Sequence, residues 1–124
     1  MLLFILTACG SAGRSTSTSG KQSVQVNETD FKITSSAITF SPGTPYHFVV
    51  TNDGQTVHEF MIIPSAMGNM DKMALTKVDN IAPGQTKSLD YTFPSSTVNS
   101  HPEFACYFPG HYEVGMRLDV TVNQ

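Results

Sequence analysis

The chain has 124 residues, of which 40% are hydrophobic and 14% charged, so it can bury one core but is too short for two. Its net charge of −3 comes without a basic patch or a phosphate-binding glycine loop. These features argue against a nucleic-acid-binding protein and against a strongly charged partner surface.

The first residues resemble an export signal. A short apolar run, residues 1–7, leads into Leu6-Thr7-Ala8-Cys9-Gly10, which resembles the lipobox of bacterial lipoproteins, where small residues precede a cysteine that is lipidated. The run is shorter than a complete signal peptide and lacks its basic segment, so we interpret residues 1–8 as a signal-peptide remnant whose start lies further upstream. A buried N-terminal strand with a free cysteine is the alternative. A transmembrane helix is excluded, because it needs about 20 apolar residues.

Residues 9–23 are mostly Ser, Thr and Gly, which is typical of a flexible linker. With lipid on Cys9, this linker would hold the folded domain, residues 24–124, on the order of 20 Å from a membrane. We therefore expect a lipid-anchored protein in the periplasm or on the outer face of the cytoplasmic membrane. If Cys9 carries lipid and Cys106 has another role, no cysteine remains for a disulfide, although an exported compartment would allow one.

From residue 24 onward apolar side chains alternate with polar ones, which is the pattern of half-buried strands, and turn signals such as Ser41-Pro42-Gly43 and Asn52-Asp53-Gly54 separate these runs. The predicted strands cover residues 24–26, 31–33, 38–40, 45–50, 57–63, 86–93, 103–107 and 116–122. Seven or eight short strands at near-regular spacing predict an all-β fold, a Greek-key antiparallel β-sandwich. Residues 64–77 interrupt this rhythm and predict one short helix or loop insertion.

The insertion contains Met67, Met70 and Met73, three methionines spaced by three residues. Flexible thioether side chains fill irregular gaps well, so we favour packing over the edge of the sandwich. Soft thioether ligands also select Cu(I), and a second, thioether-only Cu(I) site is therefore the alternative.

A metal-binding pattern lies near the C-terminus, where Cys106, His111 and Met116 follow one another with four residues in each gap. A thiolate, an imidazole and a thioether on one short loop are ligands that select copper, and His58 supplies a second imidazole upstream. The turn signal Pro109-Gly110 bends the loop back before His111. The sequence therefore predicts a copper site assembled from this loop and His58.

This arrangement resembles that of the cupredoxins, the small blue-copper electron carriers. The resemblance extends over residues 24–122 and rests on the run Asn52-Asp53-Gly54-Gln55-Thr56-Val57-His58 and on the Cys-His-Met loop. The loop spacing is similar to that of auracyanin-like and rusticyanin-like members. Two short runs resemble the corresponding sequences of cupredoxins associated with bacterial copper tolerance. They are His58-Glu59-Phe60 and Pro109-Gly110-His111-Tyr112-Glu113.

The resemblance implies one copper ion that cycles between Cu(II) and Cu(I), with His58, Cys106 and His111 in a trigonal plane and Met116 as the weak axial ligand. Plastocyanins and azurins usually carry Asn after the first His ligand, where this chain has Glu59. The hydrogen-bonded tie between the two ligand loops is therefore an open question.

Other polar residues are interpreted as surface. His47 lies within an alternating strand and His101 precedes Pro102 in a loop, so neither is expected to be a ligand. Glu28 and Asp30 lie at a turn and are expected to be solvated.

The ligand set predicts a monomeric one-electron carrier, with Phe108, Pro109 and Tyr112 around His111 as a docking patch for a redox partner. We expect no enzymatic activity, because the sequence offers neither an open coordination position nor a base-nucleophile pair. Copper handling for tolerance or delivery uses the same ligands and is the main alternative. A binuclear oxidase domain would need a second Cys where Gly110 stands, and a structural zinc site would not need an axial methionine.

Overall fold

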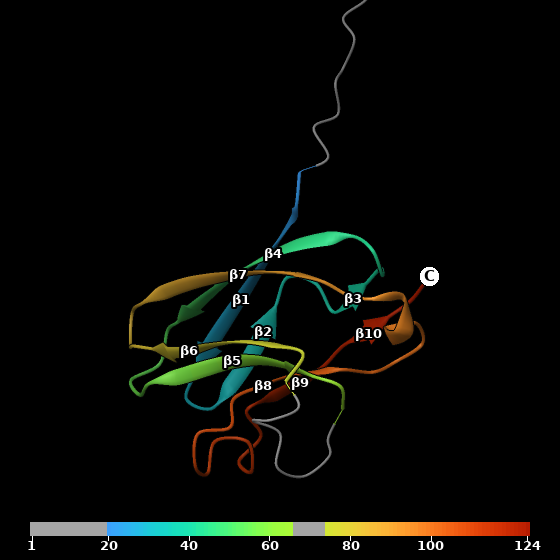
Figure 1. Ribbon diagram of the computed structural model, residues 1–124. Helices are drawn as coiled ribbons and strands as arrows, with labels where there is room; N and C mark the ends of the chain where they lie inside the picture. Colours follow the sequence, from blue (N-terminus) through green and yellow to red (C-terminus); the bar gives the residue numbers. More distant parts are fainter. Residues whose placement is uncertain (1–19, 66–73) are drawn as a thin grey trace, which may run out of the picture.

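The computed structural model describes residues 20–65 and 74–124 of the chain. Two four-stranded sheets pack face to face, and a small two-stranded pair closes one end (Figure 1). The first sheet has the order β2 (Lys32–Ser35), β1 (Gln22–Thr29), β4 (Pro45–Asn52) and β7 (Thr86–Thr92). The second has the order β6 (Thr76–Ile81), β5 (His58–Ile63), β8 (Glu103–Ala105) and β9 (Arg117–Asp119), and the small pair joins β3 (Thr39–Phe40) to β10 (Thr121–Val122). The predicted β-sandwich is confirmed.

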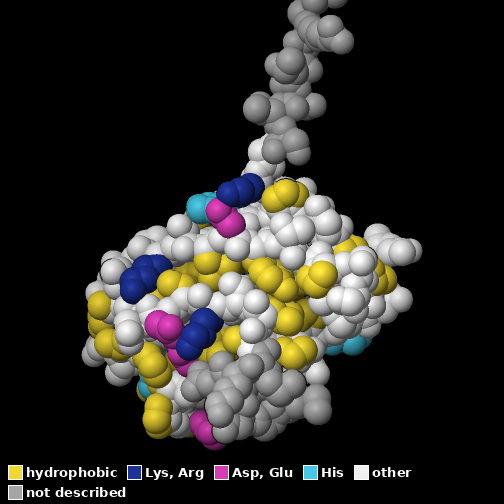
Figure 2. Space-filling view, viewed as in Figure 1, with side chains coloured by type: hydrophobic (Ala, Val, Ile, Leu, Met, Phe, Trp, Pro, Cys, Tyr) yellow, Lys and Arg dark blue, Asp and Glu magenta, His cyan; other side chains and the backbone are white. Residues whose placement is uncertain are grey.

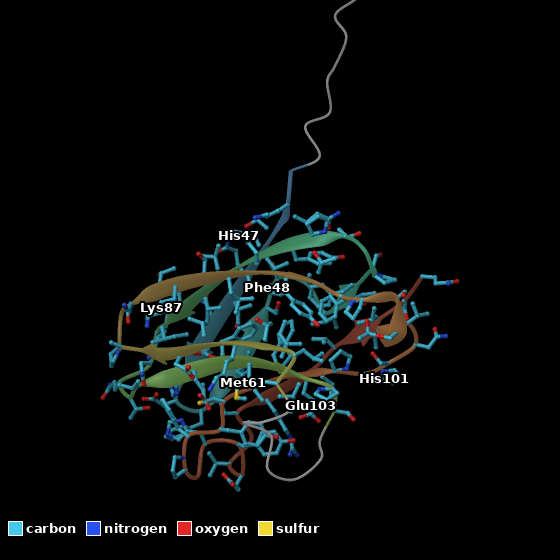
Figure 3. All side chains as sticks on the ribbon, viewed as in Figure 1. His47, Phe48, Met61, Lys87, His101 and Glu103 are labelled. Carbon is cyan, nitrogen blue, oxygen red and sulfur yellow. The ribbon has the colours of Figure 1, made fainter. Side chains whose placement is uncertain are left out.

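Alternation along the strands of the first sheet builds the core. In β4 every second residue is buried, and Figure 3 shows Phe48 pointing between the sheets while its neighbour His47 points to the outside. Because successive side chains of a strand point to opposite faces, this pattern places one row of apolar groups inside. Phe48 packs within 5.9 Å, between ring centroids, of Phe40, Phe60 and Phe104, which joins both sheets in one aromatic cluster.

All six residues of β5 are buried, which a half-exposed strand would not show. Phe60 and Ile62 belong to the main core, whereas Met61 and Ile63 form a second cluster on the outer face with Ala105. Residues of the loop between β8 and β9 pack against this second cluster. The loop that carries the predicted ligands therefore folds back over the outer face of the second sheet.

Two strand pairs are parallel, although the sequence pattern predicted an antiparallel sandwich. β1 runs parallel to β4, with Val24 opposite Phe48, and β10 runs parallel to β3. A parallel neighbour needs a crossover connection. The chain supplies one through β2 and β3, which lie between β1 and β4 in the sequence.

The described residues contain ten strands, more than the seven or eight predicted. β6 was missed, because its sequence TKVDNI has only two apolar residues and no alternation, and residues 76 and 77 were assigned to the insertion. The single strand predicted over 116–122 is two short strands that are interrupted at Val120. Cys9 and Met67, Met70 and Met73 lie outside the described residues.

The surface histidines are where the sequence predicted them. His47 is hydrogen-bonded to Asp90, which also pairs with Lys21. Figure 2 shows a His, a basic and an acidic side chain gathered just below the grey trace. His101 is exposed in the loop before β8 (Figure 3). Over the described ranges 20–65 and 74–124, no helix is long and apolar enough to cross a membrane.

Candidate metal centre

Three of the four predicted ligands meet at one end of the sandwich. Nδ1 of His58 lies 3.2 Å from Nδ1 of His111 and 4.0 Å from Sγ of Cys106, and the latter two atoms are 3.4 Å apart. One ligand atom from each of the three residues falls within 4.8 Å of the others. His58 and Cys106 are completely buried, and His111 is half-buried. The site thus has an enclosed interior and one edge toward solvent.

The backbone of the loop holds its ligands through a chain of hydrogen bonds. Cys106 N–H donates to the carbonyl of Met116, and Met116 N–H donates to the carbonyl of His111, at 3.2 and 3.1 Å. Gly110 and Gly115 adopt φ of 84° and 107°, where side chains are strained, and so permit the two reversals of the loop. The Met116 side chain is fully buried beside this network. Its backbone is therefore tied to two of the three clustered ligands.

Asp30 lies at the surface, as the sequence predicted, but it also contacts His58 directly, so the expectation that it plays no part in the site was wrong. Its Oδ1 accepts a hydrogen bond from Nε2 of His58 at 2.7 Å, and 23% of its side chain is exposed. A hydrogen bond from Gln55 N–H, followed by bonds from Thr56 and His58, lowers the pKa of Asp30 to about 2. Asp30 begins the turn of the first hairpin, 28 residues before His58, and no local pattern reveals that contact.

Phe31, the next residue, covers the other histidine. Its ring centroid lies 4.7 Å from that of His111, in an edge arrangement, while 39% of Phe31 stays exposed. Phe108 approaches His111 from another side at 5.8 Å. Burial by such groups, followed by the charge of His58, lowers the pKa of His111. A neutral imidazole is the form that binds a metal.

Glu59 forms the hydrogen-bonded link between the two ligand loops that the sequence left open. Its side chain is only 4% exposed, and Oε1 accepts a hydrogen bond from Tyr107 N–H at 3.0 Å. Glu59 follows one histidine of the site and Tyr107 follows its cysteine, so a carboxylate links the loops at this point. Such outer contacts orient metal ligands.

A second set of contacts holds the loop on its outer side. The rings of Tyr107 and Tyr112 stack at 4.4 Å with an interplanar angle of 13°, and Arg117 lies 4.9 Å above the Tyr112 ring. The Tyr112 hydroxyl donates to Oε2 of the buried Glu103 at 2.7 Å. Burial, followed by the Tyr112 hydrogen bond, raises the pKa of Tyr107 well above its ordinary value. Each of these tyrosines directly follows a ligand of the cluster, so their stack ties the start of the loop to its middle.

Glu28 is fully buried, which also contradicts the sequence expectation. Neither carboxyl oxygen has a hydrogen-bond partner among the described residues. Burial, with a smaller contribution from the charge of Glu59, raises the pKa of Glu28 to about 8. Burial likewise raises the pKa of the Cys106 thiol to about 11. A bound cation would favour the ionised form of both groups.

The chemistry of the donor set fits copper. A buried cysteine sulfur and two imidazole nitrogens in mutual contact, with a methionine beside them, are the soft and borderline ligands of a mononuclear copper site. The chain from residue 20 to 123 matches the family model described as copper binding proteins, plastocyanin/azurin family. The protein belongs to this family. Copper is therefore the cofactor of this protein, and the chemistry of this donor set fits it.

Two curated relatives are both named copper-resistant cuproprotein CopI. The one from Pseudomonas aeruginosa is 27% identical over 140 residues, which covers 82% of this chain and 76% of the relative. The one from Vibrio cholerae is 35% identical over 99 residues, which covers 70% of this chain and 56% of the relative.

Solved structures of similar fold are named as auracyanins and as an azurin. Reduced auracyanin from Roseiflexus castenholzii superposes with a TM-score of 0.67 at 15% identity, covering 85% of this chain and 100% of that one. An azurin from Methylomonas sp. strain J gives 0.62 at 17% identity, with coverages of 85% and 100%. At these identities the likeness shows the fold alone, and the predicted family is confirmed by the family match over residues 20–123.

The raised pKa of Glu28 predicts a pH-dependent stability of the metal-free protein. The folded-state pKa of about 8 lies above the ordinary 4.5, so the folded chain holds a proton that the unfolded chain releases. The corresponding stability is complete below pH 4.5 and is lost as the pH rises through about 8. One pKa unit corresponds to about 1.4 kcal/mol, so the loss amounts to several kcal/mol. Glu28→Gln should remove this loss.

Urea unfolding of the metal-free protein between about pH 5 and pH 9 measures the effect through the linear dependence of unfolding free energy on denaturant. Glu113→Gln, which removes an exposed carboxylate from the ligand loop, is the matched control and should follow the wild-type profile. Parallel profiles for wild type and Glu28→Gln would show that Glu28 does not ionise in this range.

Proposed function

We propose that this protein is a one-electron carrier with a mononuclear type 1 copper site, in which His58, Cys106 and His111 form the plane and Met116 is axial. The observation that carries the proposal is the convergence of the three donor atoms within 4.8 Å in a buried frame. Their positions are fixed by strand ends and by hydrogen bonds along the loop. A site held in one geometry suits both oxidation states and reorganises little on electron transfer.

The electron would pass through the solvent edge of His111. Phe31 and Phe108 contact the His111 ring, and Phe31 is 39% exposed. Pro109 and Val114, which is 65% exposed, lie at the surface in the same loop as His111. We define Phe31, Phe108, Pro109 and Val114 as the docking patch. Tyr112, which the sequence placed in this patch, is partly buried and stacks on Tyr107, so we leave it out of the definition. A small apolar patch suits transient docking of a redox partner on this protein, which we propose to be a monomer.

A carrier role fits the donor set better than an enzymatic one. Three protein ligands, together with the thioether of Met116, complete the coordination of a type 1 site and leave no position for a substrate. Turnover assays with phenolic and diamine substrates, run beside a known copper oxidase, test this reading. Sustained oxygen consumption by the copper-loaded protein would contradict it.

The copper-loaded protein should absorb strongly in the visible range, because a thiolate bound to Cu(II) undergoes charge transfer. Cys106→Ser should abolish the band. Met116→Leu should keep copper and colour but raise the reduction potential, since the axial ligand tunes the copper. Optical spectra and redox titration measure both effects. A wild type that binds copper without a visible band would rule out the type 1 assignment, and an unchanged potential in Met116→Leu would rule out the axial role.

Electron self-exchange between two copies tests the docking patch. Val114→Asp should slow exchange by roughly tenfold, equivalent to about 1.4 kcal/mol, because two negative charges must then approach within an apolar contact. Line broadening of nuclear magnetic resonance (NMR) signals in mixed reduced and oxidised samples gives the rate. Ile38→Asp is the matched control: Ile38 is 54% exposed and directly precedes β3, at the opposite end of the sandwich from the ligand loop (Figure 1). Equal rates in the two variants would place electron exchange elsewhere.

Copper tolerance is the second candidate function. It is favoured by the names of both curated relatives, which are called copper-resistant cuproproteins. The same ligands would then bind copper outside the cytoplasm for sequestration, oxidation or delivery. Met67, Met70 and Met73 would add Cu(I) capacity in this role; a second Cu(I) ion that is lost when all three are changed to Leu would support it.

We also propose that the protein works outside the cytoplasm, held to a membrane through lipid on Cys9. The support is the Leu6-Thr7-Ala8-Cys9-Gly10 run and the Ser/Thr/Gly-rich linker that follows it. Membrane fractionation of the exported protein tests the anchor, since Cys9→Ser should move it to the soluble fraction. Wild type that is already soluble would contradict lipidation.

A complementation experiment separates the two functions. In Pseudomonas aeruginosa lacking its CopI, the exported wild type should restore growth in copper, and Cys106→Ser should not. Val114→Asp keeps the ligands but damages the docking patch. We expect it to fail as well, which would indicate that tolerance depends on electron exchange with a partner. Full rescue by Val114→Asp would instead favour copper binding without a docked partner and move copper handling to first place.

A further inference from the structure

We propose that Asp30 is a positioning residue for copper: it fixes the ring of His58 and, as an anion bound to the far nitrogen of that ligand, favours Cu(II) over Cu(I). The inference rests on the proposed copper site and adds a determinant of its potential. It comes from the turn between β1 and β2, which the sequence pattern assigned to the surface.

The geometry assigns a separate task to each nitrogen of the His58 ring. Nε2 lies 2.7 Å from Oδ1 of Asp30, while Nδ1 faces His111 at 3.2 Å and Cys106 at 4.0 Å. A carboxylate accepts a hydrogen bond, so Nε2 carries the proton. Nδ1 then has a free lone pair that points into the donor cluster. The contact with Asp30 therefore sets both the tautomer and the orientation of the ligand.

Asp30 is itself held in place before any metal binds. Its Oδ2 accepts a hydrogen bond from Gln55 N–H at 2.7 Å, and its Oδ1 accepts one from the Thr56 hydroxyl at 2.9 Å. These donors belong to the segment that leads into His58. The carboxylate is thus fixed against the ligand by the chain that carries the ligand.

Gly54 makes room for this contact. A Cβ at position 54 would collide with the Asp30 carboxylate and would stand 3.0 Å from Nε2 of His58. A side chain here would force the carboxylate away from the ring, because the other close atom, Nε2 of His58, belongs to a buried ring that cannot move aside. The glycine is an independent sign that the approach of Asp30 to His58 is built into the fold.

The charge of Asp30 acts on the site through its direct contact with His58. The His58 side chain is completely buried, whereas Asp30 lies at the surface and is partly screened by water, so the effect depends on the 2.7 Å hydrogen bond between them. An anion at the far nitrogen makes the imidazole a better electron donor. The more electron-rich imidazole stabilises bound Cu(II) more than bound Cu(I), because Cu(II) carries the larger charge. Removal of Asp30 should therefore weaken Cu(II) binding more than Cu(I) binding and raise the reduction potential.

Competition titrations with Cu(I) and Cu(II) chelators, together with redox titration, measure the effect. In Asp30→Ala the Cu(II) affinity should fall on the order of 10–100-fold, as for other partners of metal ligands, and the Cu(I) affinity should fall less. Asp30→Asn keeps an oxygen acceptor but no charge, and should lie between Asp30→Ala and wild type. Asp53→Asn is the matched control, because Asp53 carries the same charge nearby but bonds only Asn27 among the described side chains.

Nuclear magnetic resonance of Zn(II)-loaded protein gives a readout that does not depend on redox activity. Wild type should show a slowly exchanging Nε2 proton on His58, and Asp30→Ala should lose this protection. Gly54→Ala leaves the charge in the chain but displaces it from the ring, so it should reproduce the raised potential and the lost protection. If Asp30→Ala does not fold, Gly54→Ala and Asp30→Asn provide the same test.

The possible results separate this inference from the proposed function. A wild type that binds no copper overturns both. A wild type with a normal copper band, combined with an unchanged ratio of Cu(II) to Cu(I) affinity in Asp30→Ala and Gly54→Ala, overturns only the role of Asp30. An equal rise of potential in Asp30→Ala and Asp53→Asn would show that overall charge, rather than the contact with His58, sets the potential.

Discussion

The metal centre depends on the hydrogen-bond register between β5 and β8. Met61 lies opposite Ala105 and Ile62 opposite Phe104, which brings His58 and Cys106 to the same inner face near the end of the sandwich. A shift of one residue would turn every side chain of one strand to the other face. Two cores prevent that shift, because β5 is buried on both sides. The packing that stabilises the sheet is therefore also what aligns the first two ligands.

Acidic groups around the site have three different roles. Asp30 contacts a ligand, Glu59 ties the ligand loops together, and Glu28 lies buried with no hydrogen-bond partner among the described side chains. Buried carboxylates are costly in a protein interior unless a positive charge compensates them. A copper ion would supply that charge. The acidic surroundings therefore fit a site that binds a cation.

Much of the fold and the ligand set could be predicted from the sequence because both depend on local patterns. Alternation in β1 and β4 and the turn signals around them reflect burial of one strand face. Cys106, His111 and Met116 lie within one loop, so their spacing is visible directly. β6 escaped prediction because a strand at the edge of a sheet, with mostly exposed residues, needs little apolar alternation.

The contacts of Asp30, Glu28 and Glu59 could not be predicted, since they depend on which distant segments the fold brings together. The parallel pairing of β1 with β4 places the first turn beside the loop before β5, and nothing in either segment indicates this. Acidic residues at a turn are usually solvated, and the usual interpretation fails here because the turn covers a binding site. The surface histidines followed the usual pattern because no such site lies beside them.

The stacked Tyr107 and Tyr112 have a consequence for engineering. The partners that hold this stack, Glu103 and Arg117, belong to the strands on either side of the loop and not to the loop itself. A transplant of residues 106–116 into another cupredoxin would therefore carry the copper donors but leave behind half of their outer support. The natural unit of exchange is the loop together with the facing ends of β8 and β9.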